Sequence, residues 1–128
     1  MLRINKIRKD RSAFTLVEIM IVVAIIGLLA ALAIPGFVKA RKQSQGRRIL
    51  NDARQMDAAI DQWALETGQT DGNTIYTASA QSYLKTAWKT TDLLGNAYNV
   101  TVVGSTQMSI NSTTKAALVG VGIDWGAY

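Results

Sequence analysis

Residues 19–38 read IMIVVAIIGLLAALAIPGFV, and no charged side chain interrupts these 20 positions. As a helix this stretch is about 30 Å long, which matches the hydrocarbon thickness of a bilayer. A helix that is apolar on every side must be surrounded by lipid or by other helices, and the rest of a 128-residue chain is too small to cover it. The stretch therefore predicts a membrane-spanning segment or a long signal sequence.

Basic residues lie on both sides of this span. Residues 1–13 contain five Lys and Arg side chains against Asp10, which accounts for +4 of the formal net charge of +5. Five more follow the span within ten positions: Lys39, Arg41, Lys42, Arg47 and Arg48. Because both flanks are basic, the distribution of charge does not orient the span in a membrane.

The basic cluster within residues 39–48 is open to three interpretations from the residues alone. It is a solvated helix face, a contact with lipid headgroups, or a partner for acidic residues on neighbouring copies of the chain, such as Asp52, Asp57 and Asp61. No aromatic side chains are interleaved with the cluster, so we do not expect a nucleic-acid partner.

The composition argues against most enzyme classes. The chain contains no Cys and no His, which removes thiolate nucleophiles, imidazole bases, disulfides and the usual ligands of zinc and haem. Asp124 is the one carboxylate after Asp92, too few for a calcium site near the end of the chain. We therefore expect no catalytic residues, no metal and no cofactor.

Behind the span the apolar residues keep a helical period. A single stripe is formed at spacings of four and three by Ile49, Ala53, Met56, Ile60 and Trp63. Gly68 suits the position after a helix end, and the turn-forming residues Gln-Thr-Asp-Gly-Asn follow it. One continuous helix over 14–67 is predicted.

Residues 68–128 predict a small head. Ser79 is a suitable N-cap for one short helix, and three segments alternate apolar and polar residues: 98–102, 108–110 and 117–125. The predicted fold class is α+β, with the long helix packed on an antiparallel sheet of about three strands. The expected divisions are a basic leader, an apolar helix segment, an amphipathic segment of the same helix and the head, at 1–13, 14–38, 39–67 and 68–128.

The junction between leader and span carries a resemblance to a known family. It reads Ser12-Ala13-Phe14-Thr15-Leu16-Val17-Glu18 and continues apolar to Pro35. A basic leader, a small residue before Phe, the F-T-L-V-E run, the apolar span and a Pro near its end together resemble the type IV pilin and type II secretion pseudopilin superfamily. Farther on, residues 92–98 share only Asp, Gly and Tyr with a segment of major pseudopilins.

The resemblance implies specific roles for several residues. A prepilin peptidase would cut between Ala13 and Phe14 and methylate the new amine of Phe14. Glu18 would neutralise the N-terminal amine of Phe14 on a neighbouring subunit during assembly, and a buried carboxylate with such a partner is tolerated. Gly27 and Pro35 would mark a kink or a stretch that loosens in a filament, since Pro removes a backbone donor.

The function implied is that of a structural subunit, not an enzyme, in a type IV pilus or a type II secretion pseudopilus. Its expected partners are copies of itself or other pilins, the prepilin peptidase and methyltransferase, inner-membrane lipid and, indirectly, an assembly platform protein with its ATPase. The expected location is the bacterial inner membrane, single-pass with the head in the periplasm, and then a filament.

Two alternatives stay open at this point. Ala31-Leu32-Ala33 is an acceptable signal-peptidase site, so cleavage after Ala33 would release a small periplasmic or secreted binding domain. A membrane-anchored protein that never polymerises is the other. The first residue of the exported chain separates the first alternative from the prepilin hypothesis.

Overall fold

The structure is a computed structural model that describes residues 12–128, so the predicted leader lies outside the described residues except for Ser12 and Ala13. The chain divides into two compact units, the first ending at Gly36 and the second running from Phe37 to Tyr128. One helix, α1 (Leu16–Thr67), contributes to both units, and each unit is described by itself.

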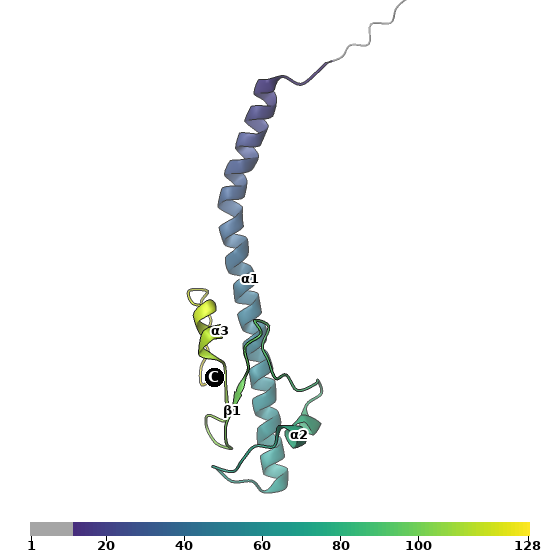
Figure 1. Ribbon diagram of the computed structural model, residues 1–128, viewed down its shortest axis with the longest axis vertical. Helices are drawn as coiled ribbons and strands as arrows, with labels where there is room; N and C mark the ends of the chain where they lie inside the picture. The colour runs from purple at the N-terminus through teal and green to yellow at the C-terminus, as the bar shows by residue number, and fades with distance from the viewer. Residues whose placement is uncertain (1–11) are drawn as a thin grey trace, which may run out of the picture. The chain divides into compact units, whose positions relative to one another are not determined.

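The first unit consists of the short segment 12–15 and the apolar part of α1, drawn in purple to blue in Figure 1. Its large apolar side chains, from Phe14 to Ile34, are between 49% and 83% exposed. α1 is long and apolar enough to cross a membrane, and none of its most apolar 18-residue window is buried. The predicted long helix is confirmed, with its first turn starting two residues later than Phe14.

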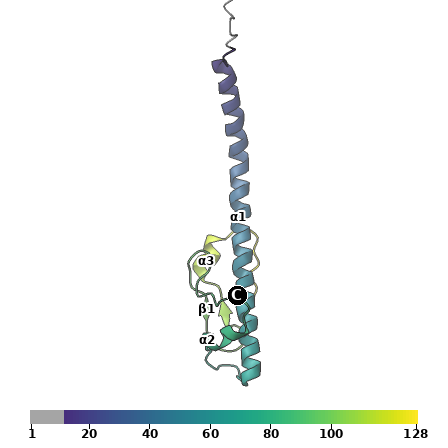
Figure 2. The ribbon, with the colours of Figure 1, turned by 90° about the vertical axis from the view of Figure 1, so that its right-hand side faces the viewer.

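The second unit packs every other element against the remainder of α1. Figures 1 and 2 show α2 (Thr77–Ala80), β1 (Asn99–Val100) and α3 (Ser112–Ala117) alongside this part of the helix. The expected apolar stripe faces them, and all of its members are buried: Ile49, Ala53, Met56, Ile60 and Trp63. The amphipathic pattern therefore predicted the covered face of the helix correctly.

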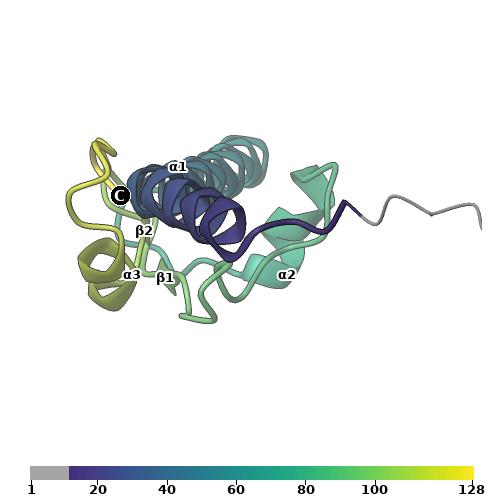
Figure 3. The ribbon, with the colours of Figure 1, turned by 90° about the horizontal axis from the view of Figure 1, so that it is seen from above.

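Two neighbouring clusters make up the core of this unit. In the first, the stripe packs against the hairpin and the C-terminal segment, with the buried residues Ile49, Leu50, Ala53, Met56, Tyr98, Met108, Ile110, Leu118 and Val121. In the second, it packs against the segment around α2, with Ile60, Trp63, Ala64, Ile75, Ala80 and Val103. Seen from above in Figure 3, α3, the hairpin and α2 succeed one another across one side of α1.

The end of α1 has the expected geometry. Gly68 adopts φ of 67°, the left-handed conformation that glycine tolerates without strain. The N–H of Gln69 then donates to the carbonyl of Ala64 at 2.8 Å, which satisfies one of the free carbonyls of the last turn. The predicted stop at Thr67 is confirmed.

The α+β class is confirmed, but the sheet has two short strands and not about three. β1 pairs antiparallel with β2 (Met108–Ser109), and Val100 lies opposite Met108. The expected alternation fails at Val102, which is 45% exposed, because this residue forms a bridge to Thr74. Val103 is turned into the core instead, and its N–H donates to the carbonyl of Asn73 at 3.0 Å.

The third predicted strand, over 117–125, is wrong. The side chain of Asn111 accepts from the N–H of Thr113 at 2.9 Å and caps α3, whose last residue is Ala117. Gly120 and Gly122 both have positive φ, which interrupts any extended run after the helix. Apolar residues three apart, Leu118 and Val121, enter the core in place of an alternating set.

The short helix near Ser79 exists but begins earlier than expected. α2 starts at Thr77 with Tyr76 in the N-cap position, and a 3-10 turn, η1 (Gln81–Tyr83), continues it. Ser79 lies inside α2, and Leu84 already has extended backbone. Packing determines this placement, because Ala80 is the one residue of the two turns that is fully buried, in the cluster around Trp63.

A buried carboxylate holds the turn before β1 to the C-terminal helix. One oxygen of Asp92 accepts from the backbone N–H groups of Leu94 and Asn96, at 2.8 and 3.0 Å. The other accepts from the hydroxyl of Thr114 on α3, a fully buried side chain that also accepts from the amide of Asn96 at 2.9 Å. The Asp and Gly of residues 92–98 thus form a hydrogen-bonded turn.

Candidate functional site

The segment predicted to be cut lies just before α1 and is accessible. Residues 12–15 have no regular secondary structure, and both Ala13 and Phe14 are exposed, the latter by 83%. A peptidase needs a segment that can leave regular backbone pairing and enter its active site. The bond between Ala13 and Phe14 meets that requirement in this structure.

Thr15 and Glu18 close the start of α1 with reciprocal hydrogen bonds. The N–H of Thr15 donates to Oε2 of Glu18 at 2.9 Å, and the N–H of Glu18 donates to Oγ1 of Thr15 at 3.2 Å. This arrangement is a capping box, which satisfies two backbone donors that have no partner inside the helix. Glu18 also lies in the first turn, where the helix dipole favours negative charge.

The capping box adds Thr15 to the candidate site, a residue whose role the sequence analysis missed. A signal for it was present, because Thr-x-x-Glu directly before an apolar run is the sequence signature of this cap. The spacing between Thr15 and Glu18 therefore forms the cap of the helix and also places the Glu18 carboxylate close to the predicted cleavage bond. Ala13, Phe14, Thr15 and Glu18 form one short exposed cluster.

Gly27 and Pro35 lie farther along α1, apart from this cluster. Both are within the helix, and Pro35 does not end it. A Cβ atom added at Gly27 would meet no other atom within 4 Å, so no contact inside the described chain requires glycine there.

Three aspartates of α1 are engaged inside the second unit. Lys89 Nζ lies 2.7 Å from Oδ2 of Asp52. The hydroxyl of Tyr128 donates to Asp57 at 2.9 Å, and the side-chain amide of Gln107 donates to Asp61. Burial and the hydrogen bond to Asp57 raise the pKa of Tyr128.

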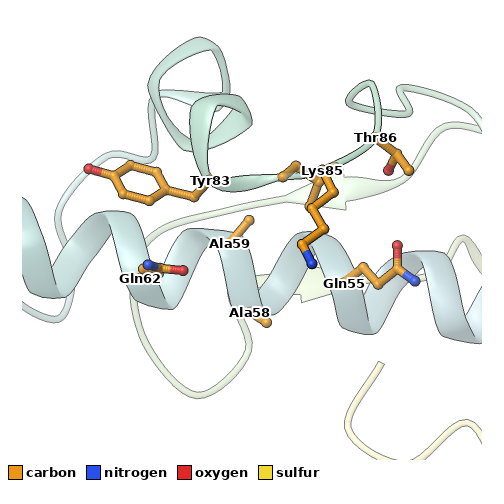
Figure 4. A pocket seen from close by; sticks show the side chains of 8 residues that line it. Gln55, Ala58, Ala59, Gln62, Tyr83, Lys85 and Thr86 are labelled. Atoms are coloured by element: carbon orange, nitrogen blue, oxygen red, sulfur yellow. The ribbon is translucent and has the colours of Figure 1, made fainter.

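An open groove of about 390 Å³ lies between α1 and the segment after α2. In Figure 4, Gln55, Ala58, Ala59 and Gln62 line it from the helix, and Tyr83, Lys85 and Thr86 line it from the other side. Its wall contains no carboxylate, so Lys85 and Tyr83 have no acidic partner in the wall for proton transfer. Across residues 12–128, no three acidic side chains are grouped as metal ligands would be.

Comparison with known proteins finds a match over the region that contains the N-terminal cluster. The family model described as the prokaryotic N-terminal methylation motif matches residues 8–34. The chain is 44% identical over 61 residues to the type IV major fimbrial protein FimA of Dichelobacter nodosus, covering 48% of this chain and 38% of the relative. No solved structure matches the chain.

Relatives come from two kinds of system. The chain is 50% identical over 44 residues to the type IV major pilin protein PilA of Myxococcus xanthus, covering 34% of this chain and 20% of that protein. It is 39% identical over 59 residues to the type II secretion system core protein G of Pseudomonas aeruginosa, covering 46% and 42%. The chain thus spans less than half the length of these curated relatives.

The family model of the methylation motif covers Ala13, Phe14, Thr15 and Glu18 of this chain. The long apolar helix and the small α+β head are the architecture expected with that motif. Over less than half of its length the chain is similar to type IV pilins and to type II secretion pseudopilins, and it carries the prokaryotic N-terminal methylation motif over residues 8–34.

Proposed function

We propose that this chain is a structural subunit that polymerises into a type IV pilus or a type II secretion pseudopilus. The observation that carries the proposal is the contrast in exposure along α1. Its large apolar side chains up to Ile34 are at least 49% exposed, whereas the stripe under the head is almost completely covered. Such a surface is stable only against lipid or against other helices, and both are available to a subunit that leaves a membrane for a filament.

Processing comes first in the proposed sequence. A prepilin peptidase cuts between Ala13 and Phe14 and methylates the amine of Phe14, and the head lies in the periplasm. The exposed, irregular backbone of residues 12–15 supports this step. The mature chain starts one residue before Thr15, so its charged amine and the Glu18 carboxylate belong to the same short cluster. An assembly platform protein and its ATPase complete the proposed set of partners.

Glu18 has two separable properties in this proposal. Its carboxylate accepts from the N–H of Thr15 within one chain, and its negative charge neutralises the amine of Phe14 on the next subunit. Glutamine at the same position of a capping box keeps the first property and removes the second. The pair Glu18→Gln and Glu18→Ala therefore separates capping from charge.

The test measures filaments in cells for wild type and both variants. We expect both variants to lose filaments, because neither carries the charge, even though the Gln variant keeps the helix start. Filaments at wild-type yield with Glu18→Gln, together with their loss in Glu18→Ala, would show that the residue acts through the cap. That result would overturn the neutralising role.

Release by ordinary signal peptidase after Ala33 remains the alternative that a structural observation favours. The second unit, Phe37–Tyr128, has its own core and would remain folded after such a cut. Mass spectrometry of the exported protein decides between them. A methylated Phe14 at the N-terminus supports the pilin proposal, and a chain that begins at Ile34 rules it out.

Gly27 and Pro35 complete the proposed site as positions where α1 loosens when subunits pack. Pro35 cannot donate a backbone hydrogen bond, which weakens the helix around Ala31. The proposal predicts that Pro35→Ala filaments are stiffer and less extensible under force. Wild-type extensibility in that variant contradicts this role.

A further inference from the structure

A basic collar follows the apolar span and has no assigned partner. We define it as Lys39, Arg41, Lys42, Arg47 and Arg48, all exposed and all on α1 within the second unit. Among residues 12–128, the ion pair between Lys89 and Asp52 is the only one, so no carboxylate within this range forms an ion pair with a collar residue.

The acidic residues on the same helix are already engaged elsewhere. Asp52 pairs with Lys89, Asp57 accepts from Tyr128 and Asp61 accepts from Gln107. These contacts occupy part of the accepting capacity of each carboxylate, which leaves less of it for a cation of another copy. The collar therefore fits an anionic partner from outside the protein better than it fits the acidic face of another copy.

The placement of the collar along the helix divides it in two. Lys39, Arg41 and Lys42 follow Val38 within about 6 Å of helix rise, which matches the 5–7 Å depth of one headgroup layer. Arg47 and Arg48 begin about 13 Å past Val38, beyond that layer. Only the first three residues, the near collar, are at the level of lipid phosphates when residues 19–38 span the bilayer.

The near collar occupies one side of the helix. At about 100° per residue, Lys39, Arg41 and Lys42 point within one arc of about 160° around the axis. Lipid headgroups surround a spanning helix on every side, and long basic side chains extend readily to that level.

We propose that the near collar binds the phosphate groups of anionic phospholipids. This inference rests on the proposed membrane anchoring of the subunit. Each Lys or Arg near an anionic membrane surface strengthens association by about fivefold, and salt weakens the effect. The near collar would then hold the subunit at the membrane until assembly takes the subunit into a filament.

The experiment uses the full chain reconstituted in phosphatidylcholine vesicles that contain spin-labelled phosphatidylglycerol or spin-labelled phosphatidylcholine. The motionally restricted lipid fraction gives the preference of the protein for the anionic lipid. Two matched variants each remove two adjacent charges: Arg41→Gln/Lys42→Gln from the near collar and Arg47→Gln/Arg48→Gln from its remainder. Both keep the basic leader, so the leader contributes equally to each.

We expect wild type to prefer phosphatidylglycerol. The near-collar variant, which removes two cations at about fivefold each, should reduce that preference by roughly 25-fold. The Arg47/Arg48 variant should keep a preference for phosphatidylglycerol close to that of wild type. Equal losses in both variants, or no loss in either, overturn the assignment. So does binding of a DNA duplex by wild type without lipid preference. Filament loss in Glu18→Gln tests the proposed function independently, since that variant leaves the collar intact.

Discussion

The two parts of α1 differ in how far their apolar side chains are covered by the rest of the chain. Before Gly36 its large apolar side chains are exposed around the whole helix, whereas after Phe37 most of its apolar side chains form a stripe covered by the head. Ile26 is 61% exposed and Ile60 is completely buried, although both are isoleucines of one helix. One helix thus has two kinds of apolar surface. The chain itself covers the stripe in the second part, whereas only surrounding molecules can cover the apolar side chains of the first part.

The number of apolar faces explains this difference. A stripe of one residue every three or four positions can be covered by a small hairpin and a few turns. A helix apolar on all sides needs contacts all round, which a head of this size cannot supply. Substitutions that are identical in chemistry but placed in the two parts should therefore have different consequences.

The largest expected effect comes from Ile60→Ala, which we expect to destabilise the head by about 4 kcal/mol because it opens a cavity in the cluster between α1 and the segment around α2. The measurement is urea unfolding in detergent micelles followed by tryptophan fluorescence. All three Trp residues lie in the second unit, so the signal reports on the head.

Ile26→Ala is the matched control for that measurement. We expect it to leave the unfolding midpoint of the head within experimental error, since its side chain has no covering contacts inside the chain, and to lower filament yield instead. A large shift of the urea unfolding midpoint in Ile26→Ala would contradict the proposed difference between the two parts of α1.

The next effect in size concerns Asp92, which holds the covering elements together. Asp92→Ala leaves the buried hydroxyl of Thr114 and two backbone N–H groups without their acceptor, and we expect a loss of up to about 3 kcal/mol. Asp92→Asn, which keeps one acceptor oxygen, should lose less. Equal stability of the Ala variant and wild type would mean that packing alone retains the head on α1.

A smaller effect is expected where the C-terminal segment approaches α1 closely. A Cβ atom at Gly46 would lie 1.9 Å from Cδ1 of Ile123 and 3.3 Å from Cδ1 of Leu118, so Gly46→Val forces both side chains to move. We expect a loss of about 2 kcal/mol. Ile123→Ala in the same chain should restore part of it, and full additivity of the two substitutions would contradict the proposed clash.

The smallest expected effect is a loss of stability of the head at alkaline pH. Burial, and then the charges of Asp52 and Asp92, raise the pKa of Tyr98, whose hydroxyl donates to the carbonyl of Ile49 at 3.4 Å. Because the folded-state pKa lies above the ordinary value of 10.0, the stabilising effect is complete below that pH and is lost as the pH rises beyond it.

The measurement compares urea midpoints of wild type and Tyr98→Phe in steps from about pH 9 to about pH 11. Wild type should lose stability over this range more steeply than the variant. Parallel curves would show that the buried phenol does not contribute to the pH dependence of the head.

The sequence was most informative where a pattern is local. The uncharged 19–38 run, the stripe from Ile49 to Trp63 and the glycine after Thr67 each predicted what the structure shows. The cleavage junction and the assembly role of Glu18 stay predictions that rest on the resemblance. Thr15 carries a local signal as well, because Thr-x-x-Glu before an apolar run is the pattern of a capping box.

The head was predicted less well because its short elements depend on distant partners. Residues 117–125 alternate like a strand, yet Asn111 caps a helix before them and two glycines with positive φ follow. Likewise, Val103 and not Val102 enters the core, because Asn73 and Thr74 pair with this part of the chain. With so few residues per element, tertiary contacts outweigh periodicity.

By itself the sequence determined that this protein has a long helix with two chemically different parts and a processing motif at its start. Both follow from side-chain order along one chain, since a helix places every third or fourth residue on the same face. Only the tertiary structure decided which residues cover the stripe, how Asp92 joins the turn before β1 to α3, and why Gly46 must be small. Those outcomes depend on contacts between segments far apart in sequence, which no local pattern encodes.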